Sequence, residues 1–169
     1  FICVLLIIFF QDFNNPFYIA KRVGKDNKIF NMFKLRTMIV NADKTGVDST
    51  ADDDQRITSI GNKIRKYKLD EIPQIFNVLI GQMSFVGPRP NVLRETELYS
   101  QEEKKLLSVR PGITDFASIC FSDEGEILKG SKDPDIDYNQ LIRPGKNYLG
   151  LFYISHRSLM LNISLIILT

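Results

Sequence analysis

The sequence LDEIPQIFNVLIGQMSFVGPRP, residues 69–90, decides how this chain is interpreted. Its first half continues a helical pattern that begins near Ile60, with apolar residues at spacings of three to five as far as Leu79. Pro73 lacks an amide donor and disfavours helical backbone at the preceding residue, so it bends this helix or starts a new one. The second half, residues 83–90, is bounded by prolines and predicts an extended segment.

Two acidic residues, Asp70 and Glu71, lie side by side just before this proline. A bend or a new helix places both near a helix N-terminus, where free N–H groups and the helix dipole favour negative charge. Four preceding basic residues also favour the ionised acids: Lys63, Arg65, Lys66 and Lys68. An ionised Asp can act as a nucleophile and an ionised Glu can bind Mg²⁺, although ordinary helix capping would explain the same pair.

Several cations are placed to bind phosphate. Arg89 lies between two prolines, which fix the local backbone and lower the entropy cost of presenting its guanidinium. Lys34 and Arg36 are two residues apart on a predicted strand, so we expect both to face outward while the apolar residues beside them face the core. Arg110 precedes a Pro-Gly turn. Each cation alone fits an ordinary surface or loop position, but together with the two acids they indicate a site for a metal-bound polyphosphate.

Outward from this stretch, the chain alternates short strands, helices and turns. Strands are predicted at Phe17–Ala20 and Lys28–Met38, with a hairpin turn at Gly24–Asn27 between them. Residues 41–54 are polar and predict a loop with at most a short helix. The other predicted segments are an amphipathic helix at Asn91–Leu107, a strand at Ile113–Phe121, a polar insertion at Ser122–Pro134 and a helix from about Asp137, interrupted at Pro144-Gly145. The predicted fold class is α+β, helix-dominated with a small β-hairpin or sheet, in a single domain.

Length and composition are those of one globular domain. The 169 residues are 44% hydrophobic and 25% charged, which excludes disorder, collagen and coiled coil as the main description. The net charge of +2 does not indicate any particular class of binding partner. Basic clusters at Lys21–Arg36 and Lys63–Lys68 suit a phosphate-bearing partner or an anionic membrane, although charge counts alone favour a plain solvated surface. A single histidine, and two cysteines without zinc spacing, exclude the common His-pair and zinc sites.

Both ends of the chain are apolar. Phe1–Phe10 is an unbroken apolar run that is too short to span a bilayer, and no basic residues of a signal peptide precede it. We interpret it as part of a membrane-inserted element, with a buried strand or core helix as the alternative. The tail, Tyr148–Thr169, has no acidic residue and predicts an interfacial or core-packed helix, because His156 and Arg157 would be costly inside a spanning helix.

Read together, these segments resemble the bacterial sugar transferase family, the monotopic phosphoglycosyl transferases. The match covers nearly the whole chain, and the run from Leu69 to Pro90 is its most specific part. The segments that carry it are Lys21–Gly24, Phe33–Met38, Leu69–Leu79, Gly81–Pro90 and Val109–Thr114, followed by a tail, Ser155–Leu168, that resembles the closing helix of the family.

The resemblance implies transfer of a sugar-1-phosphate from a nucleotide diphosphate sugar to polyprenyl phosphate, which initiates surface glycan or glycoconjugate synthesis. Asp70 would attack the phosphorus next to the sugar and form a phosphosugar intermediate, and a nucleoside monophosphate would leave. Glu71 would help to hold Mg²⁺. Partners would be both substrates and membrane lipid, with no nucleic acid. The substrate-binding residues that we expect are Arg89, Lys34, Arg36, Arg110 and Arg65.

The resemblance also implies a membrane arrangement. Residues 1–13 would be the remnant of a re-entrant membrane helix and residues 14–169 the catalytic domain, monotopic at the cytoplasmic face of the bacterial inner membrane. Two departures from the family pattern are Lys68, where members often carry Ser or Thr, and Asp115-Phe116, where many have Gly-Trp. Lys68 lacks the hydroxyl of the expected helix cap but leaves the two acids in place, whereas Asp115-Phe116 indicates a sub-group and leaves the sugar open. Two other functions compete with this one: a metal-dependent nucleotide-sugar phosphohydrolase, and a non-catalytic membrane scaffold.

Overall fold

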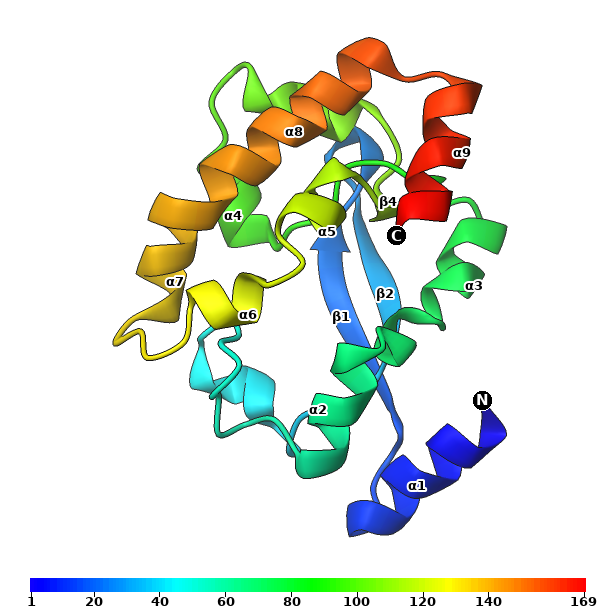
Figure 1. The fold of residues 1–169 in the computed structure, drawn as a ribbon, viewed down its shortest axis with the longest axis vertical. Coiled ribbons are helices and arrows are strands. Elements are labelled where there is room, and N and C mark those ends of the chain that lie inside the picture. Colours follow the sequence, from blue (N-terminus) through cyan, green and yellow to red (C-terminus); the bar gives the residue numbers. More distant parts are fainter.

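The computed structural model describes residues 1–169 and is built around an antiparallel hairpin that runs through the middle of the molecule (Figure 1). Strands β1 (Phe17–Val23) and β2 (Ile29–Leu35) pair along their whole length. A short turn, Lys25–Asn27, joins them and places Asp26 at φ 57°, a left-handed conformation that Asp tolerates better than most residues. The predicted hairpin is confirmed, with longer first and shorter second strands than expected.

A second, smaller sheet contains part of the predicted extended segment. Strand β3 (Ser84–Val86) pairs in parallel with β4 (Gly112–Thr114). Gly87 and Gly112 allow the two chains to approach closely, since a Cβ added at Gly112 would lie 2.1 Å from the amide nitrogen of Gly87. The predicted extended segment at residues 83–90 is therefore confirmed for Ser84–Val86.

Short helices surround the two sheets and make the structure mixed α and β in a single domain, as the sequence predicts (Figure 1). The α-helices are α1 (Ile2–Asp12), α2 (Ser59–Lys66), α3 (Gln74–Leu79), α4 (Leu93–Glu97), α5 (Phe116–Cys120), α6 (Glu124–Ile127), α7 (Pro134–Asp137), α8 (Arg143–His156) and α9 (Leu159–Leu168). The short 3₁₀ turns are η1 (Lys25–Asn27), η2 (Ala42–Thr45), η3 (Leu69–Glu71) and η4 (Glu103–Ser108), and a π-helical turn, η5, covers Tyr138–Ile142.

The helical region before the proline is broken twice. Helix α2 ends before Lys68, whose left-handed backbone, φ 52°, separates it from the turn η3. Pro73 then stands at the N-cap of α3, so the proline starts a new helix as predicted. The pattern from Ile60 to Leu79 therefore forms three short segments, and its middle segment holds the two acids.

Three sequence predictions are wrong in their detail. Residues 91–107 form two pieces, because Ser100 and Glu103 cap each other reciprocally: the Ser100 amide donates to Oε2 of Glu103 at 2.8 Å, and the Glu103 amide donates to Oγ of Ser100 at 3.2 Å. Most of the strand predicted at 113–121 is helix α5, which Asp115 caps by accepting from the Ser118 amide at 2.7 Å.

The third concerns Pro144-Gly145, which does not end the helix. Helical backbone continues from α7 through the π-helical turn η5 into α8, and Pro144 lies in the first turn of α8. The regular α-helix is therefore interrupted by a π-helical turn just before the proline, which itself donates no backbone hydrogen bond. The predicted polar insertion before it contains two short helices, α6 and the start of α7.

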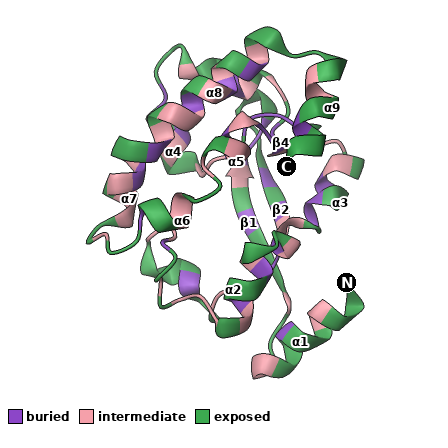
Figure 2. Cartoon of the chain, in the orientation of Figure 1, coloured by how far each residue is buried: buried purple, intermediate pink, exposed green.

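The buried side chains form several small clusters. One joins the hairpin to Met83, and a second joins Ile8 of α1 to Leu35 and Ile64. Ile8 is the only buried residue of α1, Val4 and Leu5 are partly buried against the same cluster, and most of the other apolar residues of this helix are exposed (Figure 2). The apolar run at the N-terminus is therefore helical, and the strand alternative is wrong. No helix of the chain is both long and apolar enough to cross a membrane.

Candidate active site

The acidic pair opens onto a cavity of about 1420 Å³, larger than most small-molecule sites. One face of the hairpin forms part of its wall through Tyr18 and Arg22 of β1 and Met32 and Lys34 of β2. The loop between β2 and α2 lines another part. The cavity is large enough for an extended, charged ligand.

Asp70 and Glu71 lie in the η3 turn, between the left-handed Lys68 and the start of α3. Strand β2 brings Lys34 to them: its Nζ lies 3.1 Å from Oε1 of Glu71 and 3.7 Å from Oδ2 of Asp70. Arg89 contacts the same carboxylate, with Nη2 at 2.5 Å from Oε1 and Nη1 at 3.5 Å from Oε2. Glu71 is therefore held between two cations, whereas Asp70 accepts no hydrogen bond from the protein.

The two carboxyl groups have opposite pKa shifts. Burial raises the pKa of Asp70, even though Lys34 and Arg65 act against this shift. Burial acts on Glu71 as well, but the charges of Arg89 and Lys34 and their hydrogen bonds hold the pKa of Glu71 well below its usual range. The cations that lower the pKa of Glu71 are thus Arg89 and Lys34, and not the four basic residues that precede the acids in sequence. Of those four, Arg65 acts on Asp70 in the expected direction, but burial outweighs it.

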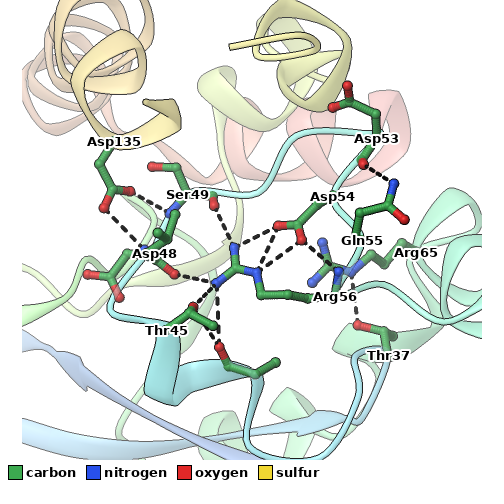
Figure 3. Close-up of polar contacts among 12 residues, drawn as sticks. Thr37, Thr45, Asp48, Ser49, Asp53, Asp54, Gln55, Arg56, Arg65 and Asp135 are labelled. Carbon is green, nitrogen blue, oxygen red and sulfur yellow. Dashed lines mark hydrogen bonds and ion pairs between the residues drawn. The ribbon is translucent and has the colours of Figure 1, made fainter. Parts of the chain in front are cut away.

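Arg65 reaches the site from α2. Its Nε donates to Oγ1 of Thr37 at 2.9 Å (Figure 3), and its other N–H groups make no hydrogen bond within the protein. Burial lowers the pKa of Arg65, while Asp70 opposes that shift. Arg65 is therefore a cation beside Asp70 with free donors. The structure brings together Asp70, Glu71, Lys34, Arg65 and Arg89.

The other two predicted binding residues lie elsewhere or are already bonded. Arg36 lines the cavity, but its Nη1 and Nη2 each donate to a carboxylate oxygen of Asp12 at 2.7 Å, and its Nε donates to the carbonyl of Asn15 at 2.8 Å. Arg36 thus fastens the end of α1 to the hairpin. Arg110 is exposed and does not line the cavity.

Two arginines that sequence reasoning did not select also belong to this region. Arg22 lines the cavity on the same face of the hairpin as Lys34, and strand alternation within the Lys21–Gly24 segment was the available signal. Arg56 organises the cavity loop (Figure 3): its Nη2 donates to Asp54 at 2.6 Å, and its Nη1 donates to Oγ1 of Thr45 and to the carbonyl of Val47, both at 2.7 Å. No local pattern in the sequence indicates that Arg56 holds this loop.

The carboxylates at the site are too few to hold Mg²⁺ by themselves. No group of three or more His, Cys, Asp or Glu side chains is placed to hold a metal ion by itself. Mg²⁺ is typically bound by one or two carboxylates together with substrate phosphates, and Asp70 and Glu71 provide two carboxylates on one turn. These two carboxylates therefore fit Mg²⁺ only if a ligand supplies further oxygen atoms.

Comparison with known proteins gives a consistent result. The family model described as bacterial sugar transferase matches residues 1–169. An uncharacterized sugar transferase of Haemophilus influenzae is 36% identical over 98% of this chain and 36% of its own length. The galactosyl transferase CpsE of Streptococcus agalactiae is 33% identical over 99% of this chain and 38% of its own length. The undecaprenyl-phosphate galactose phosphotransferase of Salmonella typhimurium is 32% identical over 94% of this chain and 33% of its own length.

The chain therefore spans between 33% and 38% of the length of these relatives. The aligned part includes the Asp-Glu pair and the cations around it, because each match covers at least 94% of the chain. With a family match along its whole length, this chain belongs to the bacterial sugar transferase family.

Proposed function

We propose that this chain transfers a sugar-1-phosphate from a nucleotide diphosphate sugar to polyprenyl phosphate, with Asp70 as the nucleophile. The observation that carries this proposal is the cavity position of Asp70: its carboxylate accepts no hydrogen bond and lies beside Lys34 and Arg65. The name of the Salmonella relative, which specifies undecaprenyl phosphate and galactose, supports the acceptor class and the type of transfer.

In the first step, an oxygen of Asp70 attacks the phosphorus that carries the sugar. The bond from this phosphorus to the bridging oxygen breaks, its electron pair stays on that oxygen, and a nucleoside monophosphate leaves. The product is a phosphosugar bound to Asp70. Lys34 and Arg65 stabilise the negative charge on the transferred phosphoryl group.

In the second step, a phosphate oxygen of the lipid attacks the same phosphorus. The bond to Asp70 breaks and returns the carboxylate, and the product is a polyprenyl diphosphate sugar. Both nucleophiles are anionic oxygens, so neither step requires a general base. The charges balance without any co-reactant.

Glu71 has a different role, because it is held ionised by Arg89 and Lys34. It fixes the directions of both cations, and with the substrate diphosphate it would hold Mg²⁺. Mg²⁺ would supply positive charge that offsets the charge of the diphosphate. Arg89 provides a planar guanidinium suited to a phosphate oxygen pair.

The exposed apolar surface favours a membrane location. Helices α1, α3 and α9 lie along the right-hand side of the view in Figure 1, and each exposes large apolar side chains. Examples are Phe10 on α1, Leu79 on α3 and Ile167 on α9. We place this side against lipid, with residues 1–13 inserted and residues 14–169 as the catalytic part, on the cytoplasmic face of the inner membrane.

The test incubates the purified chain and its Asp70→Asn variant with a panel of nucleotide sugars and Mg²⁺, with and without polyprenyl phosphate. We expect a phosphosugar adduct on the Asp70 peptide by mass spectrometry and lipid-dependent nucleotide release. Free sugar-1-phosphate released without acceptor would instead identify a phosphohydrolase. A chain that binds no nucleotide sugar would be a scaffold.

A further inference from the structure

Arg22 enters the same cavity as the acidic pair, from the other strand of the hairpin. Paired residues of an antiparallel sheet share a face, so Lys34 lies on the same face as its partner Tyr18. Arg22 also lies on this face, four residues further along β1, which is about 13 Å at the usual rise per residue. The hairpin thus presents one cation to the acidic pair and a second cation to another part of the same cavity.

Arg22 has no carboxylate partner. Its one hydrogen bond within the protein runs from Nη1 to the carbonyl of Lys21, at 2.9 Å, and no ion pair includes it. The side chain is partly buried, and burial together with the charge of Arg89 lowers the pKa of Arg22. A guanidinium that is partly desolvated, unpaired and next to another cation favours an anionic ligand.

The backbone explains why Arg22 and Arg89 are neighbours. The amide of Val23, the next residue along β1, donates to the carbonyl of Asn91 at 2.9 Å. This bond fastens the end of β1 to the segment directly after Arg89-Pro90. Arg89 therefore bonds Glu71 and, in the segment fastened to the end of β1, also contributes to the lowered pKa of Arg22.

The surroundings of Arg22 are polar. Glu95 of α4 and Asp48 of the cavity loop also line the cavity and interact electrostatically with Arg22. Burial raises the pKa of Glu95 to about 7, which reduces its negative charge near neutral pH. An isoprenoid chain requires apolar surface, and the large exposed apolar side chains lie on α1, α3 and α9. A phosphate bound at Arg22 is thus better matched to a nucleotide than to a lipid.

We propose that Arg22, together with Arg89, binds the phosphate that leaves with the nucleoside, while Lys34 and Arg65 contact the phosphate attacked by Asp70. This inference rests on the proposed function, because only a diphosphate donor needs two adjacent phosphate positions. Arg22 is then the residue that recognises the nucleotide part of the donor through its phosphate. It makes no contact with the transferred phosphosugar.

The test measures binding of UMP, CMP and GMP to the purified chain by calorimetry. With the nucleotide that binds best, we expect Arg22→Gln to weaken binding about 10- to 100-fold, because a charged hydrogen-bonding pair is lost. Arg22→Lys retains the charge without the planar guanidinium, so its nucleotide affinity should lie between those of the parent chain and Arg22→Gln. Lys21→Gln is the matched control, because Lys21 is the exposed neighbour on the opposite face of β1, and it should leave binding unchanged.

Two further measurements distinguish whether Arg22 binds the phosphate of the nucleotide or the phosphate of the lipid acceptor. Binding of the corresponding nucleoside should be equal in the parent chain and in Arg22→Gln, and the KM for polyprenyl phosphate should change less than twofold. Nucleotide binding within twofold of the parent in Arg22→Gln, with an unchanged melting temperature, overturns the role of Arg22 and leaves the proposed function intact. A selective rise in the lipid KM overturns it in favour of an acceptor site. Failure of the parent chain to bind any of the three nucleotides or a nucleotide sugar overturns both proposals.

Discussion

Arg89 donates to both carboxylate oxygens of Glu71, at 2.5 Å and 3.5 Å, and this contact connects the proline-bounded loop to the acidic turn. Lys34 contacts the same carboxylate from the hairpin. Glu71 therefore joins three separate parts of the chain, and its negative charge is the common partner of two cations. Loss of that charge should affect stability as well as activity.

Glu71→Gln should lower the free energy of unfolding by about 1–3 kcal/mol at pH 7, because two charged donors lose their anionic partner. The pKa of Glu71 is lowered in the folded state, so its stabilising effect is present above the unfolded pKa near 4.5 and is lost as pH falls below it. The gap between parent and variant in urea titrations should therefore shrink from pH 7 toward pH 3. A gap that is constant over this range would contradict the assignment.

Asp70→Asn should abolish the phosphosugar adduct and lower turnover by several orders of magnitude, because the amide is not a nucleophile. Asp123→Asn is a suitable control, since Asp123 is exposed and does not line the cavity. Intact-mass measurement after mixing with donor distinguishes the two variants. Turnover of the Asp70 variant within tenfold of the parent would reject Asp70 as the nucleophile.

Lys34→Gln should move the acid limb of the pH–rate profile to higher pH. Burial raises the pKa of Asp70, and Lys34 is the largest effect that opposes this rise. Removing Lys34 therefore raises the pKa of Asp70 further, so a larger fraction of the nucleophile is protonated at a given pH. Single-turnover formation of the adduct between pH 4 and pH 8 measures the shift. An acid limb that stays in place would show that Lys34 acts on the substrate alone.

These residues also show which features could be predicted from sequence. The hairpin and the helix start at Pro73 depend on local signals, and both are present in the structure. Helix α5 depends on an equally local signal, the capping residue Asp115, but the apolar run around it also fits a strand. The Ser100–Glu103 capping box is a readable signal of the same kind.

Other features depend on tertiary placement and have no local signal. Arg36 and Lys34 look equivalent on a strand, but α1 brings Asp12 to Arg36, and η3 brings Glu71 to Lys34. The direction of the pKa shift at Asp70 depends on how deeply the turn is buried. A pattern of charges along the chain contains no information on that depth.

Arg56→Lys should raise the KM for the donor several-fold. The guanidinium of Arg56 holds the cavity loop through Asp54, Thr45 and three backbone carbonyls, and an ammonium cannot make all of these contacts at once (Figure 3). Because Arg56 acts through the loop, the rate of adduct formation at saturating donor should change much less than KM. Gln55→Ala is the control, since Gln55 is exposed and bonds only the carbonyl of Asp53. A change confined to kcat would contradict this positioning role.

The two sides of helix α1 should respond differently to substitution. Ile8 is 2% exposed and packs against Leu35 and Ile64, so Ile8→Ala should destabilise the fold by about 2–4 kcal/mol. Phe10 is 62% exposed, so Phe10→Ser should leave the free energy of unfolding nearly unchanged. If α1 lies in lipid, Phe10→Ser should instead weaken partition into phospholipid vesicles about 10-fold or more, as expected for losing a buried aromatic side chain. Urea unfolding and vesicle flotation measure the two effects separately. Equal flotation of Phe10→Ser and the parent chain would show that this face of α1 does not contact the membrane.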